Sequence, residues 1–126
     1  MTIAFWCVLF AGLLPYVAVG IAKVGKRFDN HAPRDWLAKQ DGYRKRAHAA
    51  HLNTFEAFPF FAAGVFIAHI TIAPTNIINT IAVAFVVARV AYIWCYVSDR
   101  ASLRSIAWIV GFGLTAALYV VAGVSR

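Results

Sequence analysis

Hydrophobic and polar positions along the chain separate into four long apolar blocks and one long polar connection. The blocks cover residues 3–24, 43–72, 77–97 and 103–124, and the polar connection covers residues 25–42. A helix of roughly 20 residues, rising about 1.5 Å per residue, reaches across a hydrocarbon layer of about 30 Å. The pattern therefore predicts an all-α integral membrane protein, a bundle of four transmembrane helices in a single domain.

The connections between the blocks carry turn signals. Residues 25–42 bring Gly, Asp, Asn and Pro together and hold most of the charge, so we expect the one substantial loop there. Residues 73–76 form a short uncharged turn and residues 98–102 a second tight connection. Pro15 lies inside the first block, where it either kinks the helix or is accommodated by neighbouring helices.

Composition supports the membrane assignment. Hydrophobic residues make up 62% of the 126 residues and charged residues 13%, with a mean hydropathy of +0.70. A soluble domain of this size does not need so much apolar surface. The first block has no basic segment before it and no convincing cleavage site, so we expect a retained span. Cys7 and Cys95 fall inside apolar blocks, which favours small buried side chains.

Charge placement predicts the orientation. Residues 23–46 hold eight basic and three acidic residues, the connection after the third block adds Arg100 and Arg104, and the turn at Pro74 has no charge. The positive-inside rule then places both basic connections in the cytoplasm and both termini on the opposite side. Topology alone accounts for the net charge of +7, although a basic cytoplasmic mouth also attracts a small anion. A nucleic-acid partner is not expected, because the basic residues border a membrane domain.

Several strongly polar residues fall inside the apolar blocks, where a charge costs about 2.5 to 3.5 kcal/mol. Helical spacing places these residues on one face of the second predicted helix, on one face of the third, and at the beginning of the fourth. Arg46, Asn53 and Glu56 share a face of the second predicted helix, and Arg89, Tyr92 and Tyr96 share a face of the third. Arg104 opens the fourth, with Asp99 or Ser102 as a candidate cap.

Two interpretations of these polar residues stay open. Glu56 and Arg89 form an interhelical salt bridge that fixes packing, with Asn53 and the tyrosines as hydrogen-bonding partners. Alternatively the face is a binding site, because Glu56 alone does not neutralise the three arginines at 46, 89 and 104. We expect Glu56 to pair with Arg89, which leaves cationic donors for an anion near the cytoplasmic boundary.

His48 and His51 suggest metal or haem ligation at first sight. They lie on other faces of the helix than Arg46 and Asn53, and no further His or Cys cluster completes a site, so we expect no metal or haem. Packing or hydrogen bonding to a neighbouring helix is the expected role. The sequence contains no nucleophile triad, phosphate-binding loop or paired carboxylates. Any chemistry therefore belongs to a bound small molecule activated by cations and phenols.

Two motifs resemble a known family. The run Arg46, Ala50-His51-x-Asn53-x-x-Glu56-x-x-Pro59 precedes Arg89-x-x-Tyr92-x-x-x-Tyr96 and Leu103-Arg104. This order resembles the MAPEG family, membrane-associated proteins in eicosanoid and glutathione metabolism, over essentially the whole chain, in a bacterial-type member similar to microsomal glutathione transferases. The chain departs from the family pattern at three positions. Ala49 stands where several animal members have an arginine, Ala57 where leukotriene-C synthase has a tyrosine, and Cys95 where a glycine is frequent.

The resemblance implies a homotrimer that holds glutathione between adjacent subunits near the cytoplasmic face. Asn53 and Glu56 hold the peptide, with Glu56 meeting its ammonium group, and Arg104 corresponds to the arginine that stabilises the thiolate. The glutathione-binding residues implied are Arg46, Asn53, Glu56, Arg89, Tyr92 and Tyr96. The expected function is a glutathione-dependent transferase or peroxidase for lipophilic electrophiles, of a kind used in detoxification. The alternative is a non-catalytic relative that binds a lipid or scaffolds a partner.

Overall fold

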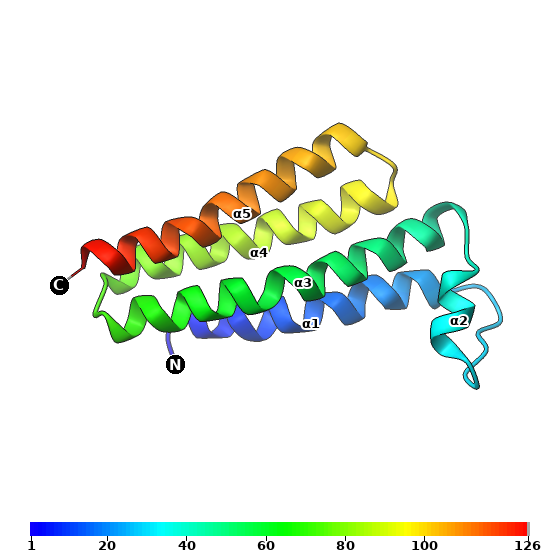
Figure 1. Ribbon diagram of the computed structural model, residues 1–126, viewed down its shortest axis with the longest axis horizontal. Helices are drawn as coiled ribbons and strands as arrows, with labels where there is room; N and C mark the ends of the chain where they lie inside the picture. Colours follow the sequence, from blue (N-terminus) through cyan, green and yellow to red (C-terminus); the bar gives the residue numbers. More distant parts are fainter. Residues whose placement is uncertain (126) are drawn as a thin grey trace.

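The computed structural model describes residues 1–125, which form five helices and no strand (Figure 1). The helices are α1 (Ile3–Lys23), α2 (Pro33–Ala38), α3 (Gly42–Ile70), α4 (Thr75–Val97) and α5 (Ala101–Val124). The four long helices lie side by side, α1 mainly against α3 and α4 mainly against α5. The start of α1 and the end of α5 lie at one end of the bundle, and α2 lies at the other.

The structure has a long helix in each of the four apolar blocks, with bounds within two residues of those expected. The predicted side-chain cap of the last helix is wrong. Arg100 is the N-cap residue of α5, and no side chain caps the helix. Asp99 instead adopts a left-handed conformation with a φ of 61°, and its backbone N–H donates to the carbonyl of Tyr96. Asp99 therefore ends α4 and turns the chain into α5.

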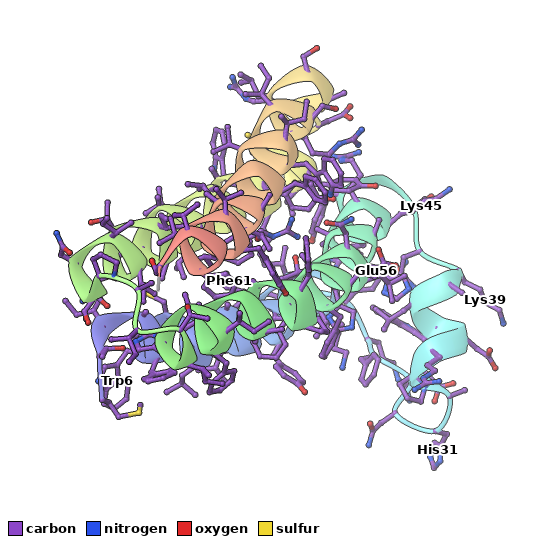
Figure 2. All side chains as sticks on the ribbon, turned by 60° about the vertical axis from the view of Figure 1, so that its left-hand side comes forward. Trp6, His31, Lys39, Lys45, Glu56 and Phe61 are labelled. Carbon is purple, nitrogen blue, oxygen red and sulfur yellow. The ribbon has the colours of Figure 1, made fainter. Side chains whose placement is uncertain are left out.

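The polar connection is not entirely a loop, because it contains the six-residue helix α2. Pro33 begins this helix, where its missing N–H costs no hydrogen bond. Leu37 is buried, and the indole of Trp36 donates to the carbonyl of Arg27. Figure 2 shows this region, marked by His31 and Lys39, projecting beyond the long helices. A helix of fewer than two turns is too short for its hydrophobic periodicity to be recognised in the sequence.

Small and aromatic side chains fill the bundle core. The rings of Phe61 on α3 and Phe85 on α4 stack at 3.9 Å with an angle of 8° between their planes. Figure 2 labels Phe61 among the helices and Trp6 on the outer side of α1. The buried residues of α1 other than Cys7 and Pro15 are alanines at positions 4, 11, 18 and 22. Small residues on one helix let the neighbouring backbones approach closely, which favours helix packing in lipid.

Three helices within residues 1–125, α1, α4 and α5, are long and apolar enough to cross a membrane. The chain is therefore described as a multi-pass integral membrane protein. The helix α3 has 29 residues but is not among the three. Its first half carries arginines, histidines, Asn53 and Glu56, which lower its hydropathy.

Candidate functional site

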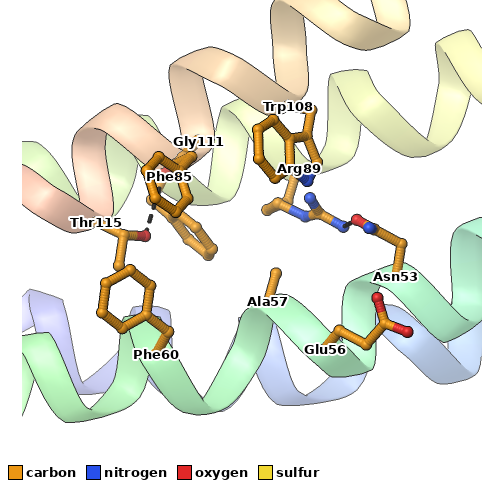
Figure 3. A pocket seen from close by; sticks show the side chains of 10 residues that line it. Asn53, Glu56, Ala57, Phe60, Phe85, Arg89, Trp108, Gly111 and Thr115 are labelled. Carbon is orange, nitrogen blue, oxygen red and sulfur yellow. Dashed lines mark hydrogen bonds between the residues drawn. The ribbon is translucent and has the colours of Figure 1, made fainter.

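Arg89 is the central polar residue of the bundle, with 2% of its surface exposed. Its Nη2 donates to Asn53 Oδ1 and to Thr54 Oγ1, each at 2.9 Å, and its guanidinium lies 4.1 Å from the centre of the Tyr92 ring. Figure 3 shows the side chain reaching from α4 toward Asn53 on α3. The predicted pairing of Arg89 with Glu56 is wrong, because the hydrogen-bond acceptors of Arg89 are uncharged.

Helix rotation explains this correction. Successive residues of an α-helix are about 100° apart, so Glu56 points almost opposite to Thr54. Thr54 is 3% exposed and faces the interior, where its hydroxyl donates to the carbonyl of Ala50 at 2.6 Å. Glu56 is exposed. Asn53 and Glu56 lie on one face of α3, as predicted. The helix α4 contacts α3 at the edge of that face formed by Asn53 and Thr54, and Glu56 lies at the other edge.

Arginine and tyrosine side chains continue from Arg89 to the start of α5. The rings of Tyr92 and Tyr96 meet edge to face with centroids 5.7 Å apart, and the Arg104 guanidinium lies 4.5 Å from the Tyr96 ring centre. We name the four residues Arg89, Tyr92, Tyr96 and Arg104 the Arg-Tyr row. The structure thus brings together the predicted residues of α4 and α5. The two tyrosines lie between the guanidinium groups of Arg89 and Arg104.

Arg46 and the histidines have contacts of their own near this end of the bundle. Arg46 donates through Nε and Nη2 to the carbonyl of Val97, at 3.2 and 3.1 Å, and so ties α3 to the last turn of α4. His51 Nδ1 lies 2.7 Å from the carbonyl oxygen of Pro15, which confirms the predicted hydrogen bond to a neighbouring helix. His48 stacks beside His51, with ring centroids 6.1 Å apart. The helix α1 continues through Pro15 without a break.

Two cavities border the Arg-Tyr row. The first, of about 200 Å³, lies between α3, α4 and α5, and we name it the aromatic cavity. Figure 3 shows Phe60, Phe85 and Trp108 around it, with the small residues Ala57 and Gly111 between them. Asn53, Glu56 and Arg89 line its polar end.

The second cavity, of about 380 Å³, lies between α4 and α5, and we name it the polar cavity. Tyr92, Tyr96, Arg104 and Ser105 line it together with Trp108. Trp108 also lines the aromatic cavity and is the residue that the two cavities share. An anionic group in the polar cavity and an apolar group in the aromatic cavity would therefore lie on either side of one indole.

Sequence reasoning missed several residues of these cavities. Trp108 is the main one, together with the aromatic residues Phe60, Phe85 and Phe112, and outside the cavities Thr54 was missed as an acceptor of Arg89. Trp108 follows Arg104 by four positions, and Thr115 follows it by eleven, so both share the helix face of Arg104. Extending that face along the fourth predicted helix would have found them. Nothing in the sequence indicated that Thr54, rather than Glu56, would accept a hydrogen bond from Arg89.

The site combines a cationic group with an apolar cavity. Guanidinium groups stabilise an anion strongly where water is scarce, and Arg104 lies in the first turn of α5, at the positive end of its dipole. The neighbouring aromatic cavity offers an apolar surface to a lipophilic molecule. The arrangement can therefore hold an anionic group and an apolar group close to each other.

Comparison with known proteins shows the family of the chain. The model of the MAPEG family matches residues 3–124. A search of curated proteins gives no match. Since the family match covers almost the whole chain, including both cavities and every residue of the Arg-Tyr row, the chain belongs to the MAPEG family.

Proposed function

We propose that the protein is a glutathione-dependent transferase for lipophilic electrophiles, in which Arg104 stabilises the glutathione thiolate. One observation carries the proposal. The Arg104 guanidinium borders the polar cavity beside the Tyr96 ring, 4.5 Å from its centre, in the first turn of α5. Within residues 1–125 no hydrogen bond from its side chain is present, so its donors are available to a ligand.

The peptide portion of glutathione matches the polar groups near Arg89. Asn53 Oδ1 already accepts from Arg89, so the N–H groups of the Asn53 amide are the ones left to bind the peptide. The exposed carboxylate of Glu56 pairs with the ammonium of the γ-glutamyl group. Arg46 supplies a cation at the mouth of the site, and Tyr92 and Tyr96 line it. These roles follow from the family. Asn53, Glu56, Tyr92 and Tyr96 line the two cavities, whereas Arg46 lies outside both.

The chemistry follows from thiol ionisation. A free thiol has a pKa of about 8.5 and is mostly protonated at neutral pH, and each unit of depression is worth about 1.4 kcal/mol. Arg104 and the positive end of α5 favour the thiolate. The sulfur forms a bond to the electrophilic carbon, the leaving group departs with its bonding electron pair, and the thiol proton passes to solvent. With a hydroperoxide, two glutathione molecules give the alcohol, water and glutathione disulfide.

The same proposal includes the membrane arrangement and the assembly. The helix α3 is long enough to serve as a fourth span, at about 1.5 Å per residue over 29 residues. The basic connection with α2 and the turn before Arg104 lie at the same end of the bundle, as cytoplasmic connections would, which leaves both termini on the other side (Figure 1). A homotrimer places each site between adjacent subunits, as in the family.

The experiment removes the charge of Arg104 and compares it with that of Arg100. Arg100 lies in the same connection, with its guanidinium 5.2 Å from the Trp94 ring centre and outside both cavities, so Arg100→Ala is the matched control. Ultraviolet difference spectra on adding glutathione measure the thiolate, and conjugation of an aryl chloride measures turnover. We expect Arg104→Ala to lose the thiolate signal and most of the rate, about a hundredfold, while Arg100→Ala keeps both. Equal behaviour of the two variants contradicts the role of Arg104.

A non-catalytic function is the second candidate, and one observation favours it. Arg46 and Arg89 both donate to acceptors of the chain itself, so part of their hydrogen-bonding capacity is already used. If these arginines serve only packing, calorimetry on the purified protein will detect no glutathione binding at millimolar concentration. Heat of binding that saturates in that range excludes this second candidate.

A further inference from the structure

The short helix α2 is held against the end of a membrane span. The helix α1 is apolar enough to cross a membrane, and its 21 residues, at about 1.5 Å each, match a hydrocarbon layer of about 30 Å. Its last residues therefore lie where the lipid headgroups begin. Leu37 of α2 is 7% exposed and belongs to one buried cluster with Ala22, near the end of α1, and Ala47, near the start of α3. This contact holds α2 at the level of the headgroups.

The aromatic side chains around α2 are of the kind found at membrane surfaces. The Trp36 and Phe28 rings meet edge to face with centroids 5.0 Å apart, and the Trp36 indole N–H donates to the carbonyl of Arg27 at 2.9 Å. Lys23 Nζ lies 4.3 Å from the centre of the Phe28 ring. Tryptophan is enriched at the boundary between membrane and water, because its ring is apolar and its N–H is polar. The axis of α2 also runs across the direction of the long helices, as expected of a helix lying along the membrane surface (Figures 1 and 2).

The connection around α2 carries an excess of positive charge. Residues 23–45 contain seven basic residues and three aspartates. Within residues 1–125 the hydrogen bonds of these basic side chains go to neutral acceptors. Lys26 Nζ donates to Gln40 Oε1 at 3.0 Å, and Arg44 Nη1 donates to two backbone carbonyls at the end of α1. The positive charges are therefore available to an anion outside the chain.

Five of the seven basic residues are exposed, and we name these five the basic surface. They are Lys26, Arg27, Arg34, Lys39 and Lys45. Figure 2 shows the Lys39 and Lys45 side chains pointing outward. A cluster of about four to eight basic residues next to a membrane span attracts anionic lipid headgroups, and each residue near the surface strengthens binding about fivefold.

We propose that the basic surface binds the phosphate groups of anionic phospholipids in the bilayer that the protein spans, with α2 lying among their headgroups. Orientation by charge requires only the number of basic residues, whereas here a packed helix holds them at headgroup level. The partner is lipid rather than glutathione, because the basic surface lies outside both cavities that border the Arg-Tyr row. The inference therefore concerns a second surface and does not depend on the proposed transferase activity.

The experiment measures the lipid selectivity of the full chain. The protein is reconstituted in phosphatidylcholine vesicles with a trace of spin-labelled lipid, and electron spin resonance gives the fraction of label held at the protein. Labelled phosphatidylglycerol, which carries one negative charge, is compared with labelled phosphatidylcholine. We expect about a fivefold preference for phosphatidylglycerol, which decreases as salt is added because exposed charges are screened.

The variants change only exposed side chains. The triple variant Arg27→Gln, Arg34→Gln and Lys39→Gln removes three charges of the basic surface and should bring the two lipids to nearly equal binding. The triple variant Arg27→Lys, Arg34→Lys and Lys39→Arg conserves the charges and should keep the preference. A further pair compares Arg34→Gln with Arg100→Gln, since Arg100 is exposed in the other basic connection. Elution in detergent verifies that every variant keeps the assembly of the parent protein.

The outcomes separate the lipid surface from its alternatives. The inference is wrong if the parent protein shows no preference for phosphatidylglycerol, or if the glutamine triple variant keeps it. An equal decrease in Arg34→Gln and Arg100→Gln also contradicts it, because the total charge of this end would then be responsible. If the glutamine triple variant binds glutathione more weakly but keeps its lipid preference, the basic surface collects glutathione instead. The lipid measurement contains no glutathione, so failure of the transferase proposal leaves its result unaffected.

Discussion

The two halves of the bundle are stabilised in different ways. In the half near α2, which we name the polar half, side chains of α3 hydrogen-bond to α4, with Arg89 on Asn53 and Thr54 and Arg46 on Val97. In the other half, which we name the apolar half, buried Phe61, Val65, Ile78 and Leu118 pack together in one cluster. The apolar half also has interhelical hydrogen bonds, from the Ala4 N–H to Asn79 Oδ1 and from the Tyr119 hydroxyl to the carbonyl of Phe60, but its buried centre consists of apolar side chains.

The difference matters because lipid provides little hydrophobic drive between helices. Helices in a bilayer associate through close packing and interhelical hydrogen bonds. The apolar half therefore depends on tight contact, as in the 3.9 Å stack of Phe61 on Phe85. Both cavities border the hydrogen-bonded side chains of the polar half. Binding capacity and packing stability thus lie in separate halves of one bundle.

The largest expected effect is in the apolar half. Phe61→Ala removes a fully buried ring from between the helices, and such truncations cost about 3 to 5 kcal/mol. The free energy of unfolding in detergent measures the loss. Phe66 on the same helix is 50% exposed, so Phe66→Ala is the control and should cost much less. A similar loss in both variants would mean that the stack with Phe85 contributes nothing of its own.

The next effect tests the polar half. Asn53→Ala removes one of the two acceptors of the buried Arg89 guanidinium, and hydrogen bonds to charged groups are worth about 1.5 to 3 kcal/mol. We expect a loss of about 2 kcal/mol in the free energy of unfolding. Asn76, exposed near the start of α4, provides the control variant Asn76→Ala. If the free energy of unfolding of Asn53→Ala is unchanged, the hydrogen bond from Arg89 to Thr54 is sufficient without the one to Asn53.

The fold could be predicted from the sequence because apolar block length determines it. Four blocks gave the four long helices to within two residues at each boundary. The helix α2 could not be predicted, since six residues contain too little periodicity to separate a short helix from a turn. The start of α5 was also misjudged, because the turn depends on the left-handed backbone of Asp99 rather than on a side-chain cap.

For the candidate site, the sequence could predict only which residues share a face of one helix. Spacing alone grouped Arg89, Tyr92 and Tyr96, and the structure confirms this group. Spacing does not say how far a helix is rotated about its axis, and a rotation of about 100° exchanges one residue for the next. For that reason the partner of Arg89 was predicted as Glu56 and is instead Asn53 with Thr54. Cavities depend on the same rotation, so residue spacing could not predict them.

A smaller effect concerns the close approach of α3 to α5 in the apolar half. A Cβ added at Gly64 would lie 3.0 Å from Tyr119 Cε2 and 3.2 Å from Leu118 Cβ, so in Gly64→Ala these two side chains must shift to relieve the close contact. Overpacking of this kind costs about 1 to 3 kcal/mol, less the gain in helix propensity of about 1 kcal/mol. Gly20 has open space around it, and Gly20→Ala should stabilise the protein slightly. Equal changes in the two variants would show that this contact is not tight.

The smallest expected effect is at Arg46, and it tests whether the polar half reserves groups for a ligand. Arg46→Met keeps the aliphatic stem but removes the donors to the Val97 carbonyl, which we expect to cost about 0.5 to 1.5 kcal/mol of unfolding free energy. The exposed neighbour Lys45 gives the control Lys45→Met, with the same loss of charge. Calorimetric titration of both variants with glutathione adds the decisive comparison. If Arg46 supplies a cation to the peptide, Arg46→Met weakens glutathione binding well beyond Lys45→Met, whereas a purely structural arginine changes stability and leaves both affinities equal.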